Sequence, residues 1–244
     1  MSTQRTPAVR DCIEQAKRNV VDCIYSQARI EGIGVTFPET QQIFDGITVP
    51  SLKVDEIVKI NNMKHAWQFL FDSVDYPLDL RYVRQLNQLI NAGLMQDAGT
   101  VRSYDVSIGG TSWRPEIPRI EDVQSTLDVL MRLPDPVDRA LSVMLYIMRG
   151  QIFSDGNKRV AQMAANQILI QSGSGYLKIP VEKMGTFYDE LIRYYESGND
   201  APLKLFLRCN AVVPRTPVPQ AANDLSPEMF IRSGAPDASD DLAL

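Results

Sequence analysis

The sequence predicts an all-α protein that carries one small β-hairpin. Most of the 244 residues fall in stretches where apolar side chains recur every three or four positions, which is the period of an amphipathic helix. Capping residues, glycines and prolines separate these stretches. Only residues 100–118 break the pattern, because β-forming side chains and a Gly-Gly pair replace the helical spacing there.

The first half of the chain predicts four helices. The first has apolar positions at helical spacing and ends before Gly32, a natural residue at a helix C-terminus. The second is short, with Thr36 as its cap and Glu39 at the capping-box position. The predicted ranges are Val9–Ile30, Thr36–Phe44, Val54–Asp72 and Leu80–Leu94.

The second half predicts the remaining helices around one central pair. Two strongly apolar segments flank a short polar loop and are expected to pack against each other. We predict six to nine helices in total, arranged around the Val137–Gln171 pair. The ranges here are Ile120–Leu133, Val137–Arg149, Val160–Gln171, Val181–Glu196 and Pro202–Cys209.

Residues 100–118 predict the hairpin. Val101, Tyr104, Val106 and Ile108 favour strands, and Gly109-Gly110 is a hairpin turn signal. Trp113 leads out of it to two prolines.

Composition excludes several classes of function. The net charge of −5 and pI of about 5.0 give no general attraction to nucleic acid, so no nucleic-acid contact is required. No apolar run approaches the roughly 20 residues that span a bilayer, and the first ten residues lack the apolar core of a signal peptide. Three scattered cysteines fit a reducing compartment, so we expect a cytoplasmic protein. A homodimer stays open.

The chain divides into three predicted parts. Residues 1–53 hold the first helices, and residues 54–211 form the helical core. Residues 212–244 are expected to be a disordered tail, because prolines and small polar residues replace large apolar ones there.

The loop between the central helices has the layout of an anion site. Asp155 is its one carboxylate and could hold a divalent metal, while Gly156 allows a sharp turn close to a phosphate. Asn157 can brace the turn, and Lys158 and Arg159 supply positive charge at the start of the next helix. The alternative is an ordinary solvated turn between two helices.

Three segments together resemble the Fic (Fido) family. The loop Gln151-Ile-Phe-Ser-Asp-Gly-Asn-Lys-Arg159 is similar to the family signature His-Pro-Phe-x-Asp/Glu-Gly-Asn-Gly/Lys-Arg. The segment from Arg29 to Thr36, with Glu31-Gly32, resembles the inhibitory motif of members whose inhibitory helix precedes the core. Residues 106–115 resemble the flap that docks the target protein. The resemblance implies a Fic-like helical bundle.

The resemblance also implies roles for individual residues. Asp155 would hold Mg²⁺, and the nucleotide, ATP or another one, would be bound by Gly156, Asn157, Lys158, Arg159 and Gln162. Glu31 would be inhibitory. A target protein would dock at the flap, at Ile108, Gly109, Gly110 and Thr111. In active members the loop histidine takes the proton from the target hydroxyl that attacks the α-phosphate of ATP.

This sequence departs from the family pattern at the catalytic position. Gln151 replaces the histidine, and an amide cannot act as a base at neutral pH. Gln162 replaces the second arginine, so the usual ion pair with the inhibitory glutamate cannot form. Glu31 could instead reach Gln162, Arg159 or Lys158.

Three functions remain open on the sequence. The first is a divergent protein adenylyltransferase that transfers AMP to a hydroxyl side chain of a target protein. The second is a catalytically impaired pseudoenzyme or a regulatory module that binds a nucleotide or a protein. The third is phosphotransfer as in Doc-type toxins, which carry lysine where Lys158 stands.

Overall fold

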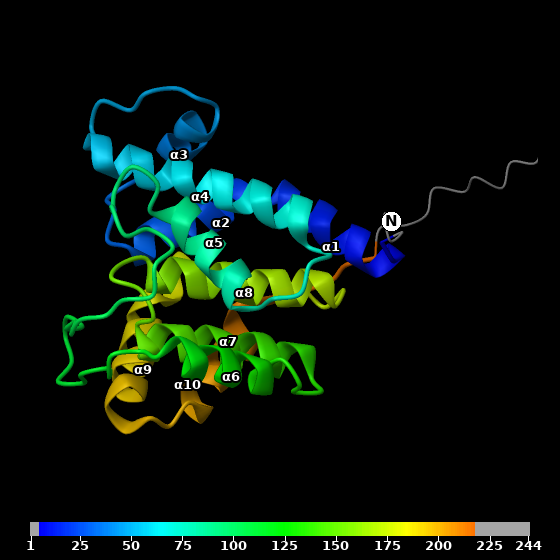
Figure 1. Ribbon diagram of the computed structural model, residues 1–244. Helices are drawn as coiled ribbons and strands as arrows, with labels where there is room; N and C mark the ends of the chain where they lie inside the picture. The colour runs from blue at the N-terminus through cyan, green and yellow to red at the C-terminus, as the bar shows by residue number, and fades with distance from the viewer. Residues whose placement is uncertain (1–4, 218–244) are drawn as a thin grey trace, which may run out of the picture.

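The computed structural model describes residues 5–217. This part of the chain forms ten α-helices, one short 3₁₀ helix and two short strands (Figure 1). The helices are α1 (Pro7–Arg18), α2 (Val20–Ile30), α3 (Phe37–Phe44), α4 (Val54–Ser73), α5 (Leu80–Ile90), α6 (Ile120–Leu130), α7 (Pro136–Gly150), α8 (Asn157–Gln171), α9 (Met184–Ser197) and α10 (Ala201–Asn210). Between residues 5 and 217 no helix is both long and apolar enough to cross a membrane.

The two central helices form the middle of the molecule. α7 and α8 lie side by side (Figure 1), and almost every residue of α8 is buried. A helix that is surrounded on all sides must be apolar or uncharged nearly all round, as the sequence of α8 is. Its buried polar side chains find partners: Asn166, for example, donates to the Leu177 carbonyl and accepts from the Leu177 amide.

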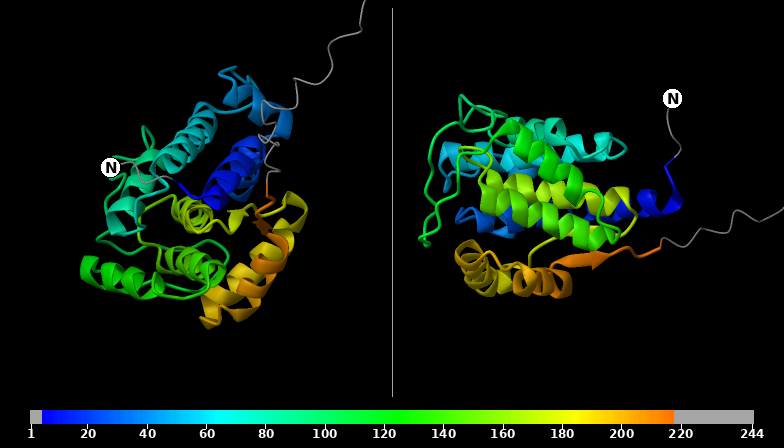
Figure 2. Two further views of the ribbon diagram at one scale, coloured as in Figure 1. Left: turned by 90° about the vertical axis from the view of Figure 1, so that its right-hand side faces the viewer. Right: turned by 60° about the horizontal axis from the view of Figure 1, so that its bottom comes forward.

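Two groups of helices cover this pair. α2, α4 and α5 lie on the α8 side, and α6, α9 and α10 lie on the α7 side (Figures 1 and 2). The largest buried side chain is Trp67 of α4, whose indole Nε1 donates to Oε1 of Gln27 on α2 at 3.1 Å. The predicted arrangement around a central pair is confirmed.

The first predicted helix is two helices. Asn19 leaves helical geometry with φ −111° and ψ 10°, and its side chain donates to the Gln15 carbonyl at 2.8 Å. Asparagine favours this kind of local bond over continued helix. The break separates α1 from α2, and it explains why the structure has ten helices rather than nine. α2 then ends at Glu31, its C-terminal capping residue.

The fold class is confirmed, but the strands lie elsewhere than expected. Within residues 5–217, one sheet pairs β1 (Gly175–Leu177) with β2 (Val212–Pro214) in antiparallel register. Residues 101–118 make the predicted turn at Gly109-Gly110 but no strand pairing, so the hairpin prediction is corrected to an extended loop. The side chain of Arg102 donates to the carbonyls of Tyr104 and Glu116 in this segment, as described below.

The predicted tail begins too early. Residues 212–214 form β2, and Arg215 pairs with Asp11 of α1 at 2.9 Å, so these residues belong to the folded core. The remainder of the predicted tail, from residue 218, lies outside the described residues.

Candidate functional site

Residues 151–156 of the loop 151–159 connect α7 to α8, and the last three residues of the loop form the start of α8. Left-handed backbone conformations mark both ends of the connection. Gln151 ends α7 with φ 45° and ψ 60°, and among the described residues it is the one non-glycine residue with positive φ. Gly156 precedes α8 with φ 81°. The backbone conformation of Gly156 favours glycine, and a Cβ there would be crowded, at 3.0 Å from Nδ2 of Asn91.

Asn157 braces the loop from inside. Its Oδ1 accepts the Phe153 amide at 3.0 Å, and its Nδ2 donates to the Phe153 carbonyl at 2.8 Å and to Oε1 of Gln151 at 3.1 Å. Gln151 completes the set by donating Nε2 to the Met148 carbonyl at 2.6 Å. Both ends of the Gln151 amide therefore hold the loop together.

Two cations stand at the start of α8. Arg159 is 1% exposed, and its Nη2 contacts Oδ2 of Asp155 at 3.0 Å. Its Nε lies 3.4 Å from Oε2 of Glu31, and Nζ of Lys158 lies 3.9 Å from Oε1 of the same carboxylate. Within residues 5–217, Nη1 of Arg159 is buried without a hydrogen-bond partner. The helix N-terminus adds positive potential at the same place.

Glu31 therefore reaches the loop cations rather than residue 162. Gln162 is buried at 1% exposure, and its Nε2 donates to the Lys158 carbonyl at 3.1 Å. It belongs to the packing of α8 and does not line the cavity described next.

A cavity of about 210 Å³ joins the loop to the flap and to Glu31. The structure brings most of the predicted site residues together here. Ile108 and Gly109 line it from the flap, whereas Gly110 and Thr111 do not. Thr111 instead donates Oγ1 to Oε1 of Glu196 on α9 at 3.3 Å. The lining consists of Glu31, Ser107, Ile108, Gly109, Gln151, Ser154, Asp155, Gly156, Asn157, Lys158 and Tyr195.

Arg102 fixes the position of the flap, a role that its sequence context did not reveal in detail. It is 2% exposed. It lies between the loop 151–159 and the flap stem, by which we mean the residues on either side of the flap, 101–105 and 116–118. Its guanidinium donates to the carbonyls of Gln151 and Tyr104 at 2.5 and 2.6 Å and to that of Glu116 at 2.5 Å. Burial lowers the pKa of Arg102. One buried cation thus ties both sides of the extended segment, at Tyr104 and Glu116, to the carbonyl of Gln151.

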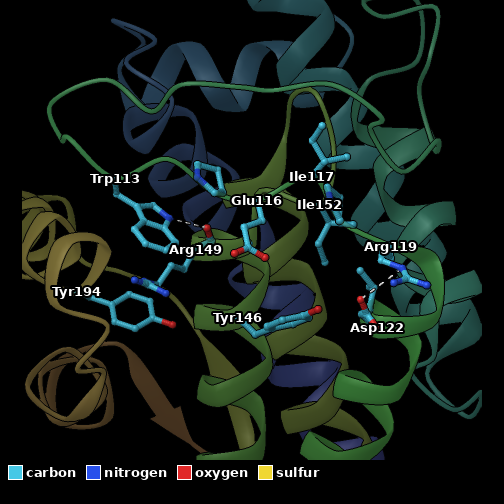
Figure 3. A pocket seen from close by; sticks show the side chains of 13 residues that line it. Trp113, Glu116, Ile117, Arg119, Asp122, Tyr146, Arg149, Ile152 and Tyr194 are labelled. Carbon is cyan, nitrogen blue, oxygen red and sulfur yellow. Dashed lines mark hydrogen bonds and ion pairs between the residues drawn. The ribbon is translucent and has the colours of Figure 1, made fainter.

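A second, larger cavity of about 410 Å³ lies behind the flap stem (Figure 3). Trp113 forms one wall: its indole donates to the Arg149 carbonyl at 3.2 Å, and the Arg149 guanidinium stacks 3.6 Å from the ring centroid. Arg119 and Asp122 pair at the other end. Trp113 therefore packs against Arg149 and does not line the cavity beside the loop 151–159.

The donor set fits a magnesium ion held together with phosphate oxygens. In the described part of the chain no three His, Cys, Asp or Glu side chains cluster as a metal site. Asp155 is 45% exposed at the cavity and can supply one carboxylate, which is how Mg²⁺ commonly binds beside substrate phosphates. The one histidine of the chain, His65, is exposed on α4 and does not line the cavity.

Comparison with known proteins identifies similar chains. Residues 77–169 match the model of the Fic/DOC family. Over 211 residues the chain is 25% identical to protein adenylyltransferase fic-1 of Caenorhabditis elegans, and over 206 residues it is 24% identical to the Caenorhabditis briggsae protein of the same name. These alignments cover 75% of this chain, which spans about 40% of the length of either relative.

The fold is also shared with a solved structure. A fragment of Fic-1 from C. elegans superimposes with a TM-score of 0.67 at 22% identity, covering 85% of this chain and 62% of that one. The family match begins just before α5 and runs through the flap, α7 and the loop 151–159 into the last turn of α8. The chain is therefore similar to Fic/DOC proteins in sequence over residues 77–169, and it shares the fold of a Fic-domain protein.

Proposed function

We propose that the cavity between Glu31 and the loop 151–159 binds the phosphates of a nucleotide, with ATP as the preferred candidate. We propose further that the protein transfers AMP slowly to a hydroxyl side chain of a target protein docked at the flap. The adenylyltransferases among its relatives support this reaction class.

The observation that carries the proposal is the buried charge of Arg159. A guanidinium at 1% exposure is costly to bury, and its contacts to Asp155 and Glu31 leave Nη1 without a partner among the described residues. Lys158 supplies a second cation and lines the cavity, whereas Arg159 lies behind the lining, in contact with the lining residues Glu31 and Asp155. Phosphate oxygens would satisfy these donors and the positive end of α8.

Asp155 would hold Mg²⁺ on the phosphates, and the metal would offset their negative charge. The Arg159 contact keeps that carboxylate at the cavity. The flap residues Ile108 and Gly109 would present backbone groups to an extended target segment, because residues 101–118 are not paired in a sheet.

The transfer would proceed without a side-chain base. The target hydroxyl oxygen forms a bond to the α-phosphorus, the bond from that phosphorus to the bridging oxygen breaks, and pyrophosphate leaves. Gln151 cannot accept the proton, which passes to water. Because a general base contributes about 10²–10⁴-fold, the transfer is expected to be slow by that factor.

Glu31 is proposed to inhibit by occupying the anion site. Its carboxylate lies against Arg159 and Lys158, the cations that phosphate would need. This arrangement differs from an ion pair with residue 162, because the Gln162 side chain bonds to the Lys158 carbonyl of its own helix. A movement of the C-terminal end of α2 that takes Glu31 away from Arg159 and Lys158 would then relieve the inhibition.

A second candidate function is a pseudoenzyme that binds a nucleotide to regulate a partner. The bonds of Gln151 to Met148 and Asn157 favour it, because they make the catalytic position part of the loop structure. Phosphotransfer remains a third candidate through Lys158, which lines the cavity.

The test uses ATP labelled at the α- or the γ-phosphate, with Mg²⁺ or Mn²⁺ and a cell lysate. The proposal expects protein labelling from α-labelled ATP alone, and its loss in Asp155→Ala. Labelling from γ-labelled ATP would establish phosphotransfer instead. Binding of Mg²⁺ and ATP by calorimetry without any labelling would establish the pseudoenzyme. Absence of both binding and labelling would overturn the nucleotide site.

A further inference from the structure

Two asparagines outside the loop hold a single carbonyl inside it. The backbone oxygen of Asp155 accepts Nδ2 of Asn87 at 2.9 Å and Nδ2 of Asn91 at 3.0 Å. Asn87 lies on α5 and Asn91 caps its C-terminal end, and each is 1% exposed. Both acceptor positions of this carbonyl are thus filled by side chains that come from another helix.

These two hydrogen bonds set the direction of the Gly156 amide. In a planar trans peptide the carbonyl and the following N–H point in opposite directions. Because the Asp155 carbonyl is held toward α5, the N–H of Gly156 is directed away from α5. Gly156 also lines the 210 Å³ cavity. The two asparagines therefore orient the peptide that begins the anion site.

Asn87 has a second bond that Asn91 lacks. Its Oδ1 accepts the amide of Gly99 at 2.8 Å, in the turn that leads into the flap. The same turn is held by Arg84, whose Nε donates to the Gly99 carbonyl at 2.8 Å. Oδ1 of Asn91, by contrast, is buried without a partner among residues 5–217. Of the two asparagines that hold the Asp155 carbonyl, only Asn87 also bonds to the turn at Gly99 that leads into the flap.

The platform behind these residues is itself anchored. Asn62 of α4 donates Nδ2 to the carbonyls of Ile90 and Ala92 at 3.1 and 2.8 Å. These carbonyls flank Asn91, so the end of α5 is fixed from the far side. A displacement of the loop would have to break bonds to buried amides, which is costly when no water replaces them.

We propose that Asn87 is a positioning residue that couples the Asp155–Gly156 peptide to the base of the flap, whereas Asn91 positions that peptide alone. With Asn87 in place, the anion site and the target-docking segment keep a fixed relation. The functional meaning of this linkage rests on the proposed nucleotide site. The linkage itself is independent of it and can be measured without nucleotide.

Three variants of the full chain separate the two bonds of Asn87. Asn87→Ala removes both bonds. Asn87→Asp keeps an oxygen acceptor for the Gly99 amide but loses the donor to the Asp155 carbonyl. Asn91→Ala is the matched control, because it removes a bond to the same carbonyl without touching Gly99.

Hydrogen exchange is measured on peptides that cover residues 153–158 and 97–102, with α9 as an internal reference. Asn91→Ala is expected to raise exchange about tenfold in the loop only. Asn87→Ala is expected to raise it in both segments, and Asn87→Asp to restore protection at 97–102 but not in the loop. Equal effects of Asn91→Ala and Asn87→Ala on both segments would overturn the proposal, as would an effect of Asn87→Ala confined to one segment.

A second arm measures binding of Mg²⁺ and ATP by calorimetry. Asn87→Ala and Asn91→Ala are both expected to weaken binding by about tenfold relative to the natural chain. If the natural chain itself does not bind, the proposed function fails while the exchange pattern still decides the linkage. If it binds and neither variant weakens it, the positioning role is contradicted.

Discussion

Asn157 donates its side-chain amide to Oε1 of Gln151 at 3.1 Å, and this bond makes the Gln151 side chain part of the loop structure. The same Asn157 holds Phe153 through two further bonds, so the amide of Gln151 extends a brace that already spans the loop. Gln151 supports the turn and, as an amide, cannot accept a proton at neutral pH.

Gln151→His is expected to introduce the missing base. Histidine is among the residues that tolerate the left-handed conformation found here, with φ 45°. AMP transfer from α-labelled ATP should rise by about 10²–10⁴-fold, the usual value of a general base. Gln151→Asn is the matched control, since it tolerates the same backbone and cannot titrate. Equal rates in the two variants would show that more than a base is missing.

Gly156→Ala is expected to destabilise the protein by about 1–3 kcal/mol. The alanine would have to adopt φ 81°, and its Cβ would lie 3.0 Å from Nδ2 of Asn91 and 3.2 Å from Cγ2 of Ile90. Urea unfolding followed by circular dichroism measures the change. Gly185→Ala is the control in α9, where a Cβ meets nothing within 4 Å. That variant should be neutral or slightly stabilising, and a similar loss in both variants would refute the account of Gly156.

Arg102→Lys is expected to release the flap stem. A lysine ammonium cannot reproduce the planar fork that serves the carbonyls of Gln151, Tyr104 and Glu116. Leaving buried carbonyls unpaired costs about 1–3 kcal/mol each, so unfolding should become easier by at least that much. Limited proteolysis should also cut residues 103–118 faster. Arg114→Lys, at an exposed flap position, is the control and should change neither result.

Stability is expected to fall as the pH rises from about 10 to 12. Burial raises the pKa of Tyr82, Tyr176 and Tyr194 to about 12, whereas tyrosine in the unfolded chain titrates near 10. In this window the unfolded state has lost protons that the folded state still holds. Each tyrosine therefore costs up to about 1.4 kcal/mol of stability per pH unit, and below pH 10 its contribution is fully present.

Urea unfolding at several pH values measures this slope. Tyr82→Phe removes one titrating group, although it also removes the bond between the phenol and Oγ of Ser73. The dependence of the unfolding free energy on pH above pH 10 should then become shallower by the contribution of one titrating group, up to about 1.4 kcal/mol per pH unit. An unchanged slope would mean that Tyr82 titrates normally in the folded protein.

The sequence predicted the central helices and the loop between them because both are local patterns. Helical periodicity marks α7 and α8, and Gly156 with the two cations marks the anion turn. The sequence left three partners open for Glu31: Lys158, Arg159 and Gln162. The structure was needed to choose among them, because it shows that the Gln162 side chain is buried and bonds to the Lys158 carbonyl within α8.

The missed features depend on contacts between distant segments. The pairing of β1 with β2 joins strands of three residues each that carry no alternating pattern long enough to detect. Arg102 donates to a carbonyl 49 residues away, a contact that no local pattern in residues 100–118 predicts. Asn87 and Asn91 looked like ordinary helix residues, and their shared partner lies beyond the flap at Asp155.

Calorimetric titration of Mg²⁺ and ATP into the natural chain and into Glu31→Gln tests the central claim most directly. Glu31→Gln removes the charge that lies against Arg159 and Lys158 without removing the side chain, and Glu182→Gln, an exposed change outside the cavity, is the control. We predict that Glu31→Gln binds about tenfold more tightly than the natural chain, a difference of about 1.4 kcal/mol. Equal affinity of the two proteins, or no binding by either, would contradict the account.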